Sequence, residues 1–229
     1  MANIKTPYII DSKRQCLPPL GKKPKVILAF AVQDTVKTLT MLATVQALHN
    51  VNTFDYDIIV SEGCDLIGSR VRLVRQAIQQ GGTHMLFIDH DMYFTPAINP
   101  LTGLKKNPIS QLLSHNKDVV GVAYNYRSLP PRSTALPFDR ESKDGKYFVD
   151  PATLPKELFK CKALGTGFLL IRLSVFDKIE KPWFQFGRDA NAELVYGEDT
   201  FFCAQVSKAG MEVWCDPAIP VSHLGEYRY

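Results

Sequence analysis

Residues 25–32 read KVILAFAV, an almost unbroken apolar run. A strand reads this way when helices cover both faces of its sheet, because neither set of alternating side chains then meets water. A strand of a sheet with one solvated face would alternate apolar and polar residues instead. This run therefore predicts an α/β fold with a buried, helix-covered sheet.

Further strand-like segments alternate with helix-like ones along the chain. The first expected helix covers 36–49, where one side is marked by Leu39, Met41, Leu42, Val45 and Leu48. Strands at 56–60, 85–88 and 118–123, with helices at 67–80 and 108–115 between them, continue the pattern. Strands separated by helices at this spacing predict a mostly parallel sheet with right-handed crossovers.

The chain of 229 residues is expected to form one domain around one core. Residues 1–24 are rich in Pro, Lys and Arg without periodicity, so they are predicted to form an extended arm, with a single domain over 25–229. The irregular stretch 124–164 holds five prolines. Such a stretch inside a compact domain is typical of a functional loop or a small hairpin.

Composition excludes some classes of partner. The net charge of +4 is too small to indicate nucleic-acid binding without a clustered basic patch. The five cysteines show no metal-binding spacing, and their odd number favours reduced thiols. No segment approaches the roughly 20 apolar residues of a membrane span or the core of a signal peptide. We expect a cytoplasmic protein with no transmembrane segment, for which peripheral membrane contact stays open.

Two carboxylates follow the strand expected at 85–88. Asp89 and Asp91 are separated by one residue and fall at the carboxyl edge of the sheet, where open α/β folds bind ligands. Mg²⁺ and Mn²⁺ take oxygen ligands and share them with substrate phosphates. The pair therefore predicts a cation site, although acidic residues also end strands simply by forming turns. His90 between them is expected to point away, because neighbours in an extended segment face opposite sides.

Four separated motifs resemble the nucleotide-sugar glycosyltransferases of the GT-A fold. They are MLFIDHDM (85–92), ALGTGFLL (163–170), GEDTFFC (197–203), and VWCDP with VSH (213–217 and 221–223). The motifs come in the family's order and span roughly residues 25–225. The resemblance implies a GT-A domain with three α/β/α layers that transfers a sugar from a UDP- or GDP-linked donor to a glycan, lipid-linked or protein acceptor.

The resemblance also implies the roles of the acidic motifs. Asp89, Asp91 and His223 would hold one Mn²⁺ or Mg²⁺ that bridges the donor diphosphate. A cation in this place stabilises the charge that develops on the leaving group. Asp199 would be the base of an inverting reaction, with Glu198 touching the acceptor or a nearby loop. An acidic pair at a helix start also satisfies the cap and the helix dipole, so that role stays open, as does the stereochemistry.

The donor site is predicted to combine nucleobase-flanking, diphosphate-binding and sugar-binding groups. Topology and resemblance place the nucleobase beside the loops after the first two strands. They place the diphosphate at the start of a helix. The sugar is placed at a glycine pair, whose backbone can approach a ligand closely. The residues are Ala31, Gln33, Glu62, Arg70, His90, Gly165, Thr166 and Gly167. Trp183 is a candidate for stacking on the acceptor, although aromatic side chains near loops more often close a core.

Three other functions were weighed against the transferase. A phosphatase of the haloacid-dehalogenase type carries its Asp-x-Asp after the first strand, whereas here the motif follows the third. A sugar nucleotidyltransferase has a glycine-rich basic loop after its first strand, and the only charge at that place in this chain is Asp34. A non-catalytic nucleotide-sugar-binding module stays open, although the presence of both Asp89 and Asp91 with Asp199 and His223 favours an enzyme.

Overall fold

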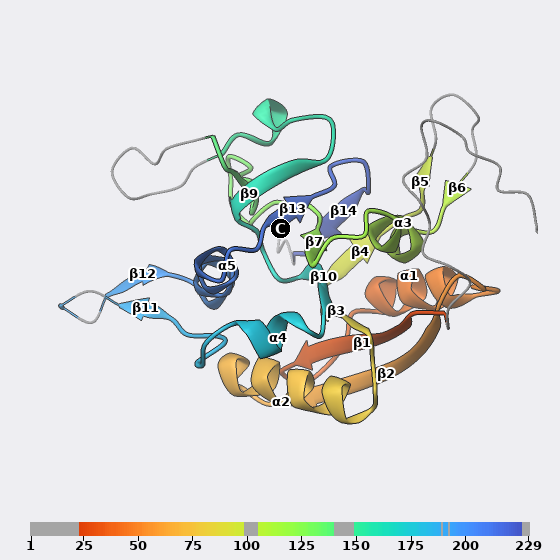
Figure 1. Ribbon diagram of the computed structural model, residues 1–229. Helices are drawn as coiled ribbons and strands as arrows, with labels where there is room; N and C mark the ends of the chain where they lie inside the picture. Colours follow the sequence, from red (N-terminus) through yellow and green to blue (C-terminus); the bar gives the residue numbers. More distant parts are fainter. Residues whose placement is uncertain (1–22, 99–104, 140–148, 189, 192, 226–229) are drawn as a thin grey trace, which may run out of the picture.

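The computed structural model describes residues 23–98, 105–139, 149–188, 190–191 and 193–225. Almost all of the arm predicted at 1–24 lies outside these residues. The described part is organised around an eight-stranded sheet with the strand order β2-β1-β3-β10-β7-β13-β9-β8 (Figure 1). The predicted α/β class is confirmed. No helix among the described residues is both long and apolar enough to cross a bilayer.

The first half of the sheet is parallel, as the sequence predicted. Strand β1 (Lys25–Val32) lies between β2 (Asp55–Glu62) and β3 (His84–Asp89) and pairs with both in parallel. The crossovers are helices α1 (Thr38–Leu48) and α2 (Leu66–Gln79). Because the three strands run the same way, their carboxyl ends meet at one edge of the sheet.

The second half of the sheet is mixed, and the prediction of a mostly parallel sheet is wrong there. Strand β10 (Phe168–Arg172) runs antiparallel to both of its neighbours, β3 and β7 (Val119–Gly121). Strand β13 (Val213–Cys215) is parallel to β7, and β9 (Phe159–Ala163) and β8 (Leu136–Pro137) follow in antiparallel pairing. Between β7 and β10 the described chain holds no α-helix, only the 3-10 turn η1 (Pro151–Thr153), so no crossover enforces parallel pairing there.

Helices cover both faces of the sheet (Figure 1). On one face α2, α4 (Val175–Lys178) and α5 (Glu198–Lys208) contribute to one apolar cluster; on the other, α1 and α3 (Pro108–Ser114) contribute to a second. This cover on both sides explains why β1 is buried along nearly its whole length.

Helix α1 faces the core with its small side chains, which reverses the expected orientation. Only Leu48 of the predicted apolar side is buried, whereas Leu39, Met41, Leu42 and Val45 are 41% to 58% exposed. The buried positions of α1 are instead small, and its Thr44 satisfies its hydroxyl by donating to the carbonyl of Thr40 at 2.8 Å. Small residues let the helix approach the core closely. Most of the larger aliphatic side chains of α1 therefore lie on its outer face, exposed to solvent.

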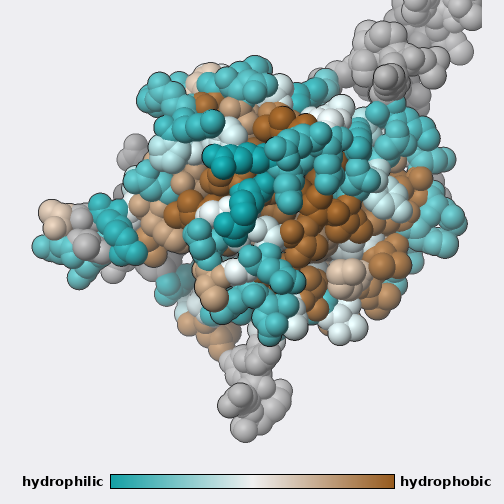
Figure 2. Space-filling view, turned by 90° about the horizontal axis from the view of Figure 1, so that it is seen from below, coloured by the Kyte–Doolittle hydropathy of each residue, from teal (hydrophilic) through white to brown (hydrophobic). Residues whose placement is uncertain are grey.

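Apolar side chains also gather on the face seen from below in Figure 2. Edge strand β2, which lies at the bottom of Figure 1, exposes Tyr56, Ile58 and Val60 on one of its faces. These three residues pair in register with Val26, Leu28 and Phe30 of β1, so they share the sheet face that α1 covers farther in.

Three small two-stranded sheets complete the described fold. Strand β4 (Met92–Phe94) pairs with β14 (Val221–His223), β5 (Ala97–Ile98) with β6 (Lys105–Lys106), and β11 (Gly187–Arg188) with β12 (Leu194–Tyr196). The first of these pairings positions the candidate site.

Candidate functional site

The carboxyl ends of β1, β2 and β3 bring several predicted donor-site residues to one edge. Ala31 pairs with Asp89 in register, and Val32 pairs with Glu62. A hollow of about 170 Å³ opens beside them, lined by Ala31, Val32, Gln33, Gly63, Cys64, Leu66, Ser69 and His90. Three predicted donor-site residues therefore line this hollow, whereas Glu62 stands next to it on the neighbouring strand.

Strand pairing brings Asp91 and His223 together from distant parts of the chain. The chain turns after β3 at 90–91 and enters β4, whose Met92 pairs in register with His223 of β14. The amide of Leu224 donates to the carbonyl of Asp91 at 2.9 Å. As a result, His223 Nε2 lies 3.2 Å from Asp91 Oδ2, so two of the three predicted metal ligands are neighbours.

Arg127, from the loop after β7, covers this pair. Its Nη2 contacts Asp91 Oδ2, and its Nε donates to His223 Nε2 at 3.0 Å. The other imidazole nitrogen, Nδ1, lies 3.2 Å from the carbonyl oxygen of Asn125. In the neutral tautomer with its proton on Nδ1, Nε2 carries the lone pair that binds metals, whereas in the protonated imidazole both nitrogens act as donors.

Asp91 is ionised in this environment despite its burial. The residue is 1% exposed, and burial alone would raise the pKa of its carboxyl. The hydrogen bond and charge of His223, together with the charges of His90 and Arg127, outweigh burial and hold the pKa of Asp91 below its ordinary value. An ionised carboxylate is the state that a cation needs in a ligand.

The donor chemistry of Asp91 and His223 fits a divalent cation. Asp91 Oδ1 is buried without a hydrogen-bond partner, and Oδ2 and His223 Nε2 turn toward a common cationic neighbour. The carboxylate is a ligand type that suits Mg²⁺ and Mn²⁺, and the imidazole is one that binds divalent transition-metal ions. Within the described ranges, however, no three His, Cys, Asp or Glu side chains form a group able to hold a metal ion. The set is a two-residue one, to which substrate oxygens would have to be added.

Asp89, the third predicted ligand, is bound to Arg70 instead. Arg70 Nη2 lies 3.0 Å from Asp89 Oδ1, and Arg70 Nε lies 3.4 Å from Glu198 Oε1. The guanidinium also packs over the ring of Phe87, 4.9 Å from its centroid. Burial alone would lower the pKa of Arg70, but the charges of Asp89 and Glu198 raise it above its ordinary value. The three side chains form a charge cluster with one unpaired donor, Arg70 Nη1.

The burial of Arg70 corrects its predicted role. Its side chain is 2% exposed and already bound to two carboxylates, so it does not stand open to a diphosphate. Glu198 is likewise 7% exposed, and its carboxylate meets Arg70 rather than an acceptor. Both residues act as supports for Asp89 and for the start of α5.

Asp199 has the electrostatic properties of a base. Burial, followed by the charge of Glu198, raises the pKa of Asp199 to about 6. Its Oδ1 accepts from the amide of Thr200 at 2.7 Å, so the side chain also serves the helix start. The pKa of Tyr126 rises to about 12 through burial and the charges of Asp199 and Glu198, which places Asp199 within electrostatic reach of Tyr126.

Gly165 and Gly167 make room for a tyrosine rather than for an open ligand site. A Cβ at either position would come within 2.6 Å of the Tyr124 hydroxyl oxygen, which accepts from the amide of Gly167 at 2.9 Å. Thr166 between them is 2% exposed. Because Tyr124 fills this space, the predicted donor-sugar contact of these three residues has no opening in this structure.

A cavity of about 880 Å³ adjoins Asp91 and His223. It is lined by Lys37, His90, Tyr126, Arg127, Ser128, Leu129, His223 and Gly225. His90 does not point away as expected: its Nε2 lies 3.8 Å from Asp91 Oδ2, and the residue lines both this cavity and the smaller hollow. The turn at 90–91 breaks the extended alternation on which that expectation depended. His90 therefore lies between the smaller hollow and the larger cavity.

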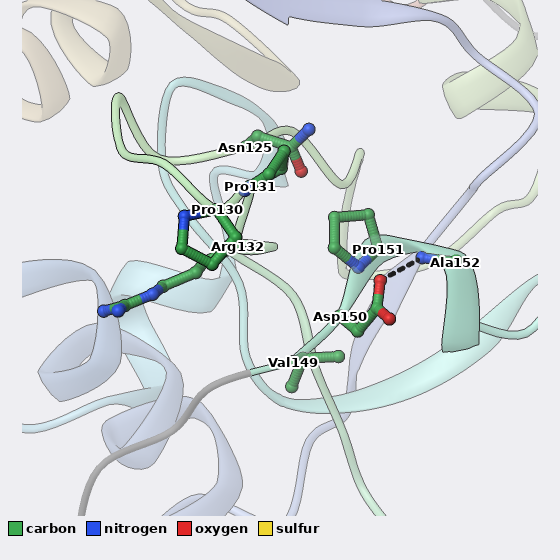
Figure 3. A pocket seen from close by; sticks show the side chains of 8 residues that line it. All are labelled: Asn125, Pro130, Pro131, Arg132, Val149, Asp150, Pro151 and Ala152. Carbon is green, nitrogen blue, oxygen red and sulfur yellow. Dashed lines mark hydrogen bonds between the residues drawn. The ribbon is translucent and has the colours of Figure 1, made fainter.

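A third hollow, of about 620 Å³, lies between Pro130–Arg132 and Val149–Ala152, with Asn125 at its edge (Figure 3). Its Asp150 carboxylate accepts from the amide of Ala152 at 2.9 Å. Because none of the predicted site residues lines this hollow, we place the chemistry at the 880 Å³ cavity instead.

The sequence left Trp183 open between acceptor stacking and core packing and gave Arg127 no role; the structure places Trp183 in the core and Arg127 beside the candidate metal ligands. Trp183 is 7% exposed and packs against Phe176, with ring centroids 5.1 Å apart, so it belongs to the core. Arg127 contacts two predicted metal ligands. The available signal for Arg127 was its position just after a predicted strand at the same sheet edge.

Comparisons with known proteins reach the fold only. No protein-family model and no curated protein sequence matches the chain. Among solved structures, the chain is similar to A197 from STIV, with a TM-score of 0.54 and 16% sequence identity over 89% of this chain and 86% of that one. At this identity the likeness supports the α/β architecture and carries no statement about function.

Proposed function

We propose that the chain is a metal-dependent glycosyltransferase of the GT-A type, which moves a sugar from a nucleoside-diphosphate sugar to an acceptor hydroxyl. The observation that carries the proposal is the meeting of Asp91 and His223 at the substrate edge of the sheet, where a buried carboxylate oxygen lacks a partner. Within the described part of the chain, the residues that line the cavity beside them include basic but no acidic side chains, which suits an anionic donor.

In this reaction Asp91 and His223 would hold the divalent cation, which when bound would stabilise negative charge on the departing nucleoside diphosphate. Asp199 accepts the proton of the acceptor hydroxyl. The acceptor oxygen then bonds to the anomeric carbon as the bond from that carbon to the diphosphate oxygen breaks. A base with a pKa of about 6 is ionised at neutral pH and retains enough basicity to take the proton as the bond forms.

The polar groups around these residues have supporting tasks. The carbonyl of Asn125 fixes the orientation of the His223 imidazole through Nδ1. Arg70 holds Asp89 and Glu198, which positions β3 and α5 relative to each other. The hollow lined by Ala31 and Gln33 is assigned to the nucleobase, and His90 lies between that hollow and the larger cavity.

The proposal is tested by nucleotide release. The protein is incubated with Mn²⁺ and, in separate reactions, UDP- and GDP-linked sugars, and the free nucleoside diphosphate is quantified against a chelator control. We expect Mn²⁺-dependent release with one donor class, lost in Asp91→Asn and His223→Ala. Asp177→Asn, an exposed carboxylate of α4, is the matched control and should retain the wild-type rate.

The alternative function is a binding module that holds a nucleotide sugar without reacting. Saturable binding of a donor with no release of nucleoside diphosphate, over a range of acceptors, would favour this module. Release that is unchanged by a chelator and by Asp91→Asn would refute the metal-dependent mechanism.

A further inference from the structure

Arg127 occupies the position in which a metal ion would meet its ligands. Its guanidinium contacts Asp91 Oδ2 through Nη2 and His223 Nε2 through Nε, the two atoms that the proposed function assigns to a cation. A guanidinium and a divalent ion cannot share these atoms, because both are positive and would stand within a few ångströms of each other. One must leave when the other arrives.

The arginine is free to leave because about half of its side chain is exposed to solvent. Its side chain is 48% exposed, whereas the side chain of Asp91 beneath it is 1% exposed. Exchange of an exposed guanidinium with water costs little free energy. Asp91, held by the pairing of β4 with β14, stays in place.

The space into which Arg127 would move favours an anion. Of the residues that the structure describes, Arg127 itself, Lys37, His90 and His223 line the cavity of about 880 Å³, and none of its described lining side chains is acidic. Lys37 is held at the edge by its hydrogen bond to the carbonyl of Leu224 at 3.1 Å. A displaced guanidinium would therefore gain little from protein groups there and would pair with a phosphate of the ligand.

We propose that Arg127 is an exchangeable resident cation, which neutralises Asp91 and His223 in the metal-free protein and is displaced when a divalent ion binds with a diphosphate. This inference rests on the proposed function, because it needs the metal site. It adds regulation: the metal ion binds weakly by itself, and a diphosphate strengthens its binding by drawing Arg127 away, so the two ligands bind cooperatively.

The test is the affinity for Mn²⁺ alone, without nucleotide, measured from the electron paramagnetic resonance signal of free Mn²⁺. Removal of the competing charge in Arg127→Met should tighten Mn²⁺ binding by about five- to tenfold. Arg127→Lys, which keeps the charge without the two-point contact, should give an intermediate affinity. Lys37→Met is the matched control, since it removes a positive charge from the same cavity but not from Asp91, and it should shift the affinity by less than Arg127→Met does.

A second readout follows the arginine directly. In a spectrum of arginine Nε–H groups, the signal that disappears in Arg127→Met should move when diamagnetic Mg²⁺ is added to the wild-type protein, because its bond to His223 is broken. The arginine signal lost in Arg70→Lys should stay unchanged under the same titration.

The outcomes separate the two proposals. If wild type and Arg127→Met bind Mn²⁺ equally, or the variant binds more weakly, the exchange is refuted while the metal site stands. If neither protein binds Mn²⁺ and Asp91→Asn changes nothing, the proposed function fails and the exchange fails with it. If Arg127→Met binds Mn²⁺ more tightly than wild type, and the double variant with Asp91→Asn loses this binding, both the metal site and the exchange of Arg127 are supported.

Discussion

The two aspartates of the Asp-x-Asp motif are each paired with an arginine, yet the two pairs differ in almost every physical respect. Arg70 is 2% exposed in its side chain and contacts Asp89 and Glu198 from inside the protein. Arg127 is 48% exposed and contacts Asp91 from the solvent side. The Asp–Arg ion pair at Asp89 therefore has a buried arginine, whereas the pair at Asp91, two residues later, has a solvent-exposed one.

The difference follows from the elements that carry the arginines. Arg70 projects from the regular helix α2, and the ring of Phe87 and two carboxylates surround its guanidinium. Arg127 belongs to the irregular segment after β7 and reaches Asp91 over the edge of a cavity. Water cannot take the place of the buried Arg70 guanidinium, whereas it can replace the exposed guanidinium of Arg127, and His223 then still lies 3.2 Å from Asp91.

The largest expected effect concerns Asp199, which follows Glu198 of the buried charge cluster at the start of α5. Asp199→Asn removes the proposed base, and we expect the rate of sugar transfer to fall by about 10²–10⁴-fold. Folding should be unharmed, because burial already disfavours the ionised side chain, as its raised pKa indicates. Transfer kinetics and urea unfolding measure the two quantities. A variant with full transfer activity would remove Asp199 from the mechanism.

The next largest effect concerns Arg70. Arg70→Met leaves the buried Glu198 and the partly buried Asp89 without a counter-charge, and the free energy of unfolding should fall by about 3–5 kcal/mol. Urea denaturation measures the loss, with Arg75→Met as the control, because Arg75 is exposed on the same helix. A loss below about 1 kcal/mol, which is typical of exposed pairs, would erase the contrast between the two arginines.

A smaller effect appears in the pH profile. With the pKa of Asp199 raised to about 6, the transfer rate should rise as pH passes through that value, by about tenfold between pH 5 and 7. The same shift has a consequence for folding. Between the ordinary pKa and the folded-state value the unfolded chain releases this proton first, so the contribution of Asp199 to stability falls as pH rises through that window. Asp199→Asn should abolish both pH dependences.

The smallest effect is expected at the open pair. Arg127→Met should change the free energy of unfolding by less than about 1 kcal/mol, and the change should shrink as salt is added. The same urea series used for Arg70→Met measures it. A loss comparable to that of Arg70→Met would mean that Arg127 is a fixed support, and the comparison would then fail.

The sequence predicted the parallel half of the fold because its strands and helices alternate without interruption. Helix α1 separates β1 from β2 and helix α2 separates β2 from β3, and such helical crossovers are typical of parallel pairing. The apolar run of β10 carries no information about direction, so its antiparallel insertion between β3 and β7 was not foreseen. The orientation of α1 was mistaken for a related reason: periodicity identifies an apolar side but not whether small residues on the other side pack more closely.

The site was predicted in part. Asp91 and His223 meet as the resemblance implied, and Ala31, Gln33 and His90 line one hollow at the predicted edge. The pairing of Asp89 with Arg70 was not predicted, because the burial of an arginine depends on tertiary contacts that no local pattern encodes. Arg127 belongs to a segment without periodicity. In such a segment, sequence spacing does not predict which residues lie next to each other in space.

Strand β14 carries His223 on only three residues, and its partner β4 has the same length. A ribbon this short is held by few backbone hydrogen bonds, so it opens locally at a lower free energy than the eight-stranded sheet. Such opening would move the His223 imidazole away from Asp91 while the core of the eight-stranded sheet stays folded. Heat inactivation should therefore precede melting, and amide exchange in β14 should be faster than in β1 long before the fold is lost.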